Sequence, residues 1–178
     1  GSPSPARCRP DPPRGPPRIT DEQRLKLDLM PFETRTVQQY GVVWDHVEYQ
    51  HDVLRRWINA PDPDQPKLKR KFLCRRDPRD ISTIWFYDPE VEQYYAIPYR
   101  NTAHPAISLW ELREAEKHAQ AERPTVPVDE NLIFEAYDKM QAIEESAKKL
   151  TKKARRNKER SRLGFANARE HLPPSSPP

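Results

Sequence analysis

Five carboxylates lie close together in this sequence, and clustered carboxylates are groups that bind catalytic metal ions or act as general acids and bases. They fall in the stretch RRDPRDISTIWFYDPEVEQYYAIPYRN, residues 75–101. The five are Asp77, Asp80, Asp88, Glu90 and Glu92. They would form a catalytic site only if a rigid fold brought them together beside a metal ion or a nucleophile.

The local sequence around two of these carboxylates favours turns instead. Asp77 and Asp88 each precede a proline, and proline biases the preceding residue away from helix while its own φ angle is fixed. Residues with high β propensity flank both Asp-Pro pairs. We therefore predict that Asp77 and Asp88 shape loops and that Asp80 pairs with a neighbouring arginine.

Other side chains that could carry chemistry are poorly placed for it. His46 and His51 fall on different predicted elements, and His104 and His118 have no partner at a metal-ligand spacing. The four glycines of the chain leave no Gly-rich phosphate loop. No serine or cysteine stands in a convincing histidine and acid context. We predict no catalytic residue, no metal site and no cofactor in this chain.

A run of positive charge is the clearest functional signal. Residues 148–162 hold nine basic residues and one acid, Glu159, and so carry +8, whereas the whole chain carries +4. Charge runs are usually solvated faces, but the lack of compensating acids favours nucleic acid here. No aromatic residue interrupts the run, so we predict phosphate contacts without base stacking. The predicted DNA-binding residues are Lys148, Lys149, Lys152, Lys153, Arg155, Arg156, Lys158, Arg160 and Arg162.

An apolar seam runs along the segment that holds these charges. Its residues alternate spacings of three and four, as in a coiled coil. One interpretation is a helix packed on its own domain or paired with another protomer; the other is a helix laid into a groove on a partner protein. Both stay open, with Ile133, Met140, Ile143 and Leu150 as the partner-binding positions and Ala136, Ala147 and Ala154 between them.

The helices that position these residues are predicted from periodicity and caps. Thr20 begins a short polar helix that runs to Leu29, and residues 51–60 place Val53, Leu54, Trp57 and Ile58 on one helical face. A further helix starts after Ser108, where Glu111 completes a capping-box pattern. Asp129 caps a long helix that continues to about Leu163.

The strands are predicted from runs of branched and aromatic residues. VVWDHVEY, residues 42–49, indicates a hairpin centred on Asp45 and His46, and Gly41 before it marks a bulge or bend. We predict three more strands, at residues 69–76, 83–87 and 93–97, and expect the last two to form a hairpin. We expect Ile84, Trp85 and Tyr87 in the core.

Composition sets the remaining boundaries. Many of the 21 prolines crowd the two ends of the chain, so residues 1–19 and 164–178 are predicted to be disordered. Cys8 and Cys74 define no disulfide framework, which is consistent with a reducing cytoplasm. No apolar run reaches membrane-spanning length. The opening Gly-Ser, without an initiator Met, indicates a fragment.

Four strings in this order resemble the C-terminal β-barrel of Mu-type DDE transposases, the class of phage Mu, TniA and TnsB, also called integrase-like transposases. The strings are RTVQQYGV (35–42), RRDPRDISTIWFYDPE (75–90), IPYRN (97–101) and PAISLWELREA (105–115). The similarity covers roughly residues 29–163. It implies a mainly β fold with flanking helices: a small barrel within residues 20–120, a linker at 121–128 and a basic helical tail at 129–163. Leu54 and Trp57 would then cap an open end of the barrel, and Trp110 would anchor the helix that follows it.

The resemblance also implies a function. Enzymes of this family join transposon ends to target DNA with an RNase H-like core that uses three metal-binding carboxylates and Mg²⁺. That core would precede Thr20, so no catalytic role is expected here. The barrel and tail would contact DNA, neighbouring protomers or an AAA+ ATPase partner, in the bacterial cytoplasm at the nucleoid. The alternative is a protein-interaction module, barrel plus docking helix, that does not bind DNA.

Overall fold

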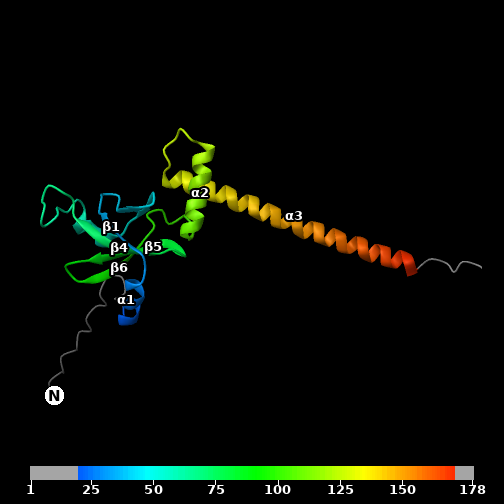
Figure 1. Cartoon of the computed structure of the whole chain (residues 1–178), viewed down its shortest axis with the longest axis horizontal. Helices are drawn as coiled ribbons and strands as arrows, with labels where there is room; N and C mark the ends of the chain where they lie inside the picture. Colours follow the sequence, from blue (N-terminus) through cyan, green and yellow to red (C-terminus); the bar gives the residue numbers. More distant parts are fainter. Residues whose placement is uncertain (1–19, 171–178) are drawn as a thin grey trace, which may run out of the picture. The chain divides into compact units, whose positions relative to one another are not determined.

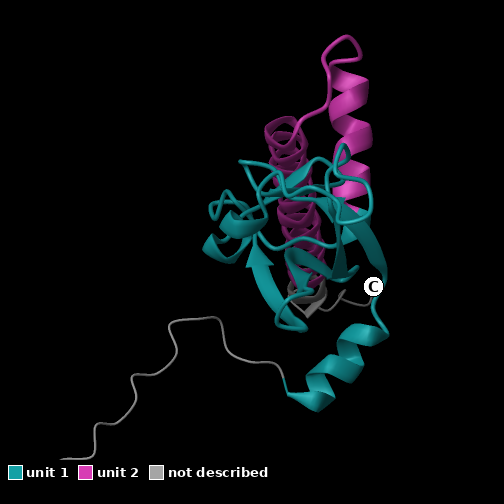
Figure 2. Cartoon of the chain, turned by 90° about the vertical axis from the view of Figure 1, so that its left-hand side faces the viewer, with its two compact units in different colours: residues 1–110 teal, residues 111–178 magenta. Residues whose placement is uncertain are grey.

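The computed structural model describes residues 20–170, with side chains up to Gly164. The chain divides into two compact units, residues 1–110 and 111–178, which are considered one at a time (Figure 2). Of the segments predicted to be disordered, residues 1–19 and 171–178 lie outside the described residues, whereas residues 164–170 are helical, contrary to the prediction.

The first unit is built on antiparallel strands. A four-stranded sheet has the order β1-β4-β5-β6, and β2 pairs with β3 in a separate hairpin (Figure 1). Before the sheet comes the short helix α1 (Asp21–Asp28), and a 3₁₀ helix, η1 (Asp52–Trp57), follows β3. The strands are β1 (Phe32–Thr36), β2 (Val42–Trp44), β3 (Val47–Tyr49), β4 (Lys71–Asp77), β5 (Asp80–Asp88) and β6 (Gln93–Pro98).

The second unit is helical. It contains most of α2 (Leu109–Glu122) and all of α3 (Glu130–Glu170), which continues past the Leu163 where the sequence pattern ended. Ion pairs from Lys139 to Glu122, 3.0 Å, and from Arg123 to Glu135, 3.5 Å, join the two helices.

The expected antiparallel strands, flanking helices and long helix are confirmed, whereas the expected barrel and the mainly β character are not. Helix α3 alone has 41 residues, whereas the longest strand, β5, has nine, and the fold is mixed α/β. Within the described residues, one isolated β-bridge, between Tyr49 and Tyr99, links the β2–β3 hairpin to the end of β6 in the larger sheet. Strands β2 and β3 have three residues each and form a ladder only with each other.

The predicted hairpin at residues 42–49 is confirmed. Val42 pairs with Tyr49 and Trp44 with Val47, and the two turn residues between them have φ angles of 49° and 66°. Two successive positive φ angles are typical of a type I′ turn, whose twist matches that of the strands. Gly41 is the predicted bend: its φ is 104°, and a Cβ there would lie 2.0 Å from the Tyr49 carbonyl oxygen. Only glycine fits this position.

One face of the sheet forms the core. Along β5, Ile84 and Phe86 are buried, whereas Trp85 and Tyr87 on the opposite face are half-buried. The expectation that Trp85 and Tyr87 join Ile84 in the core is therefore wrong, because successive side chains of a strand point to opposite faces.

Helix η1 covers part of this core. Leu54 and Trp57 are both buried, as predicted, and their spacing of three suits a 3₁₀ helix, in which residues i and i+3 lie in line. The Trp57 ring packs against Phe72, with ring centroids 5.0 Å apart, and Phe72 packs against Phe86 at 5.1 Å. Trp110, predicted to anchor the following helix, is instead 61% exposed.

Candidate nucleic-acid interface

The long helix α3 begins at a strong cap and is packed only near its start. The Leu132 amide donates to Asp129 Oδ1 at 2.8 Å, which confirms Asp129 as the cap. Ile133, Phe134 and Ala136 are buried, but every side chain from Ala142 to Gly164 is exposed. The outer part of the helix therefore presents its whole circumference to solvent.

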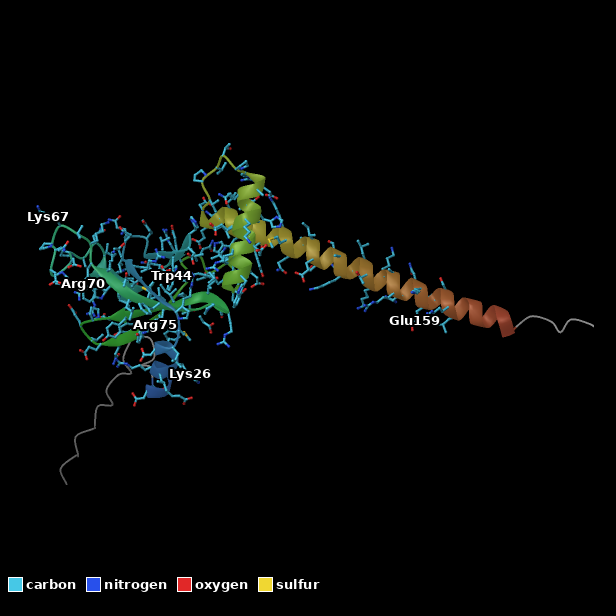
Figure 3. All side chains as sticks on the ribbon, viewed as in Figure 1. Lys26, Trp44, Lys67, Arg70, Arg75 and Glu159 are labelled. Atoms are coloured by element: carbon cyan, nitrogen blue, oxygen red, sulfur yellow. The ribbon has the colours of Figure 1, made fainter. Side chains whose placement is uncertain are left out.

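All nine predicted DNA-binding residues lie on this exposed part of α3, where Figure 3 labels Glu159. They do not form a uniform ring. Five of them share one face with Asn157 and line a shallow groove along the helix: Lys149, Lys152, Lys153, Arg156 and Arg160. This spacing of three and four residues keeps the five cations on one side over about three turns.

The charge of this segment is largely uncompensated within the protein. Lys148 pairs with Glu144 at 2.7 Å and Lys149 with Glu145 at 4.0 Å, both at exposed i,i+4 positions. Such surface pairs are weak. The other seven basic residues of 148–162 make no ion pair with any described residue. The basic face is thus free to meet a polyanion.

The apolar seam of α3 is buried at its start and exposed farther along the helix. Ile133 and Ala136 are buried and Met140 is half-buried, whereas Ile143 and Leu150 are each 68% exposed. The first turns of the seam are thus covered within the chain. Its later part is bare.

The carboxylates of residues 77–92 act in turns, as predicted for Asp77 and Asp88. Asp77 accepts from the Arg79 amide at 2.9 Å and from its guanidinium at 3.0 Å, within the β4–β5 turn. The expected pairing of Asp80 with an arginine is wrong, because Asp80 accepts from the Ser82 amide at 3.0 Å. Residues 20–170 hold no group of three metal-ligating side chains.

Asp88 does more than shape its loop. Its side chain has no exposed surface, and its Oδ1 accepts from the Glu90 amide at 2.9 Å. Its Oδ2 accepts from Trp57 Nε1 at 3.1 Å and from the Arg56 guanidinium. This carboxylate therefore fixes the β5–β6 turn to η1, a contact between residues 31 positions apart.

The same environment sets the charge of Asp88. Burial acts to raise the pKa of the carboxyl group, but the hydrogen bonds from Arg56, Trp57 and the Glu90 amide outweigh it and hold the pKa below its ordinary value. The folded state thus favours the ionised carboxylate more than the unfolded chain does.

Asp88→Asn is expected to destabilise the protein by about 1–3 kcal/mol near neutral pH, because charged hydrogen bonds to a buried group are lost. The folded pKa is depressed, so this stabilisation is complete above the unfolded value of about 3.9 and disappears as pH falls through the folded value. Thermal unfolding of both proteins from about pH 7 to pH 2 measures it. A gap between their midpoints that stays constant over this range would exclude the charge of Asp88 as its source.

Two buried or half-buried arginines, which the sequence did not single out, tie distant segments together. Arg75 donates to the carbonyl oxygens of Asp28 and Met30, at 3.0 and 2.9 Å, and to Tyr94 Oη at 2.8 Å, and so attaches the end of α1 to the sheet. Arg76 is 4% exposed, lies 4.3 Å from the centre of the Trp44 ring and pairs with Asp45. Both arginines therefore stabilise the fold of the first unit.

Comparison with known proteins gives one match. No helix in residues 20–170 is long and apolar enough to cross a membrane. No protein of curated function matches the chain. Residues 27–94, from the end of α1 to the start of β6, match the family described as Mu transposase, C-terminal. Strands β1 to β5 and both Asp-Pro turns fall within this match, so residues 27–94 are similar to the C-terminal region of Mu-type transposases.

Proposed function

We propose that this chain is a DNA-contacting part of a transposase and that the outer part of α3 binds the phosphate backbone without reading base sequence. The observation that carries the proposal is the largely uncompensated charge of residues 148–162, on a stretch of helix in which every side chain is exposed. The match to a transposase region supplies the biological setting. No catalytic step is assigned to any residue of this chain.

The dimensions of the helix suit a duplex. Fifteen residues of helix span roughly 22 Å, and duplex DNA carries one phosphate charge per about 1.7 Å of its axis. The five cations of the basic face and the flanking Arg155 could meet about four to six phosphates together. The segment 148–162 contains no aromatic side chain for stacking on bases. Affinity without sequence preference is the expected result.

A second candidate function is protein interaction, and the bare part of the seam favours it. Ile143 and Leu150 expose large apolar side chains that no described residue covers. The family resemblance implies an AAA+ ATPase that selects target DNA, and α3 would offer such a partner an apolar stripe. This function is compatible with DNA binding, since the basic face and the seam lie on different sides of α3.

Titration of the chain against fluorescently labelled duplexes tests the proposal. We expect equal affinity for a transposon-end duplex and for a random duplex, with a slope of log affinity against log salt of about −4 to −5. If no binding is seen at low salt, the interaction module takes the place of the DNA-binding function. Strong preference for one duplex would contradict binding through phosphates alone.

A further inference from the structure

The bare part of the seam is a short apolar stripe with a defined position on α3. Met140, Ile143, Ala147, Leu150 and Ala154 repeat at spacings of three and four, and none of them is buried. At 3.6 residues per turn, the centre of this stripe lies about 140° around the helix from the centre of the basic face. A protein covering the stripe would therefore leave the basic face open.

The charge along α3 is divided into two blocks of opposite sign. Residues 130–147 hold five acids and one base, Lys139, for a net charge of −4, whereas residues 148–162 carry +8. Two copies of α3 paired in parallel would place +8 beside +8. Paired antiparallel, each acidic block would lie beside the basic block of the other copy, so charge complementarity selects the second copy in this orientation.

The sizes of the seam residues specify how far the two helices overlap. In an antiparallel pair centred between residues 148 and 149, Ile143 lies level with Ala154 of the second copy, and Leu150 lies level with its Ala147. Each large side chain then faces a small one, as close packing requires. In the same register Glu144 flanks the seam on the side where the second copy carries Arg155.

We infer that the bare stripe of α3 is a self-association surface, on which two copies of this chain pair as an antiparallel coiled coil over residues 140–157. The pairing is weak, because it spans little more than two heptads and includes two alanines. It does not depend on DNA binding, and it would hold two basic faces outward for separate duplex segments.

Sedimentation equilibrium over a wide range of chain concentration tests the inference. We expect the mean mass to rise from 21.0 kDa toward twice that value, and less so at high salt, where the attraction between the blocks is screened. The double variant Ile143→Gln, Leu150→Gln should stay monomeric, with helix content unchanged because glutamine is a good helix former. Leu163→Gln is the matched control: Leu163 is an exposed leucine of α3 that lies off the seam.

A monomer at every concentration would overturn the inference, and so would a dimer that the double variant leaves intact. We expect the double variant to bind DNA with unchanged affinity, because the seam and the basic face are different surfaces of α3.

Single cysteines determine the orientation. The background is Cys8→Ser; Cys74 can stay because it has no exposed surface and burial raises the pKa of its thiol to about 12. In the antiparallel pair Ala147→Cys lies near the centre and forms a disulfide between copies. The two Ala154 positions are eleven residues apart along the pair, about 16 Å, so Ala154→Cys does not. Disulfides at both positions would indicate a parallel pair and overturn the assignment.

Discussion

Replacement of Lys152, Lys153, Arg155 and Arg156 by glutamine is expected to weaken binding of duplex DNA on the order of a thousandfold at about 0.1 M salt. Each phosphate contact releases counterions, so the loss of four contacts should flatten the slope of log affinity against log salt by roughly 3–4. Transposon-end and random duplexes should lose affinity equally, because phosphates carry no sequence information. Fluorescence anisotropy at several salt concentrations measures both quantities.

A variant with the same change in net charge provides the control. It replaces four exposed lysines that lie outside α3, namely Lys26, Lys67, Lys71 and Lys117. Figure 3 labels the first two. Their replacement by glutamine removes four charges but none from the basic face, so affinity should fall only slightly. Equal losses in the two variants would mean that the total charge of the chain, and not α3, governs binding.

Trp57→Ala is expected to lower the stability of the first unit by about 3–5 kcal/mol. Trp57 is 6% exposed, packs on Phe72 and donates to Asp88, so its removal leaves a cavity and an unpaired site on a buried carboxylate. For a domain of this size such a loss lowers the thermal midpoint by at least about 12 °C. Differential scanning calorimetry records the transition.

Trp110→Ala is the control that shows whether the loss of stability depends on the burial of the tryptophan or only on its removal. With 61% of its surface exposed, Trp110 should contribute little, and the midpoint should move by no more than a few degrees. The structure would be wrong about the core if the two variants lost equal stability, and wrong about η1 if Trp57→Ala were harmless.

Short-range features of this protein follow from its sequence alone. The type I′ turn at Asp45 and His46, the bend at Gly41 and the Asx turn at Asp77 all depend on a few adjacent residues. The start of α3 at Asp129 is equally local, since one carboxylate satisfies an amide three residues away. The positive charge of residues 148–162 can be predicted for the same reason, because it depends only on consecutive residues.

Tertiary structure decided which side chains are buried and which distant groups meet. Nothing near Asp88 indicates that its partners are Arg56 and Trp57, about 30 positions earlier, and nothing near Arg75 indicates that it holds the end of α1. The family resemblance predicted a small β-barrel, but the strands form a four-stranded sheet and a separate two-stranded one.

The same limit applies to the exposure of aromatic and seam residues. Phe86 faces the core and Trp85 the opposite side, and residue type does not indicate this, because large apolar side chains occur on both faces of β5. On α3 one continuous pattern of spacing covers buried Ile133 and exposed Leu150. Periodicity identifies the side of a helix that could be covered. Whether anything covers it depends on packing with elements remote in sequence, which local patterns do not encode.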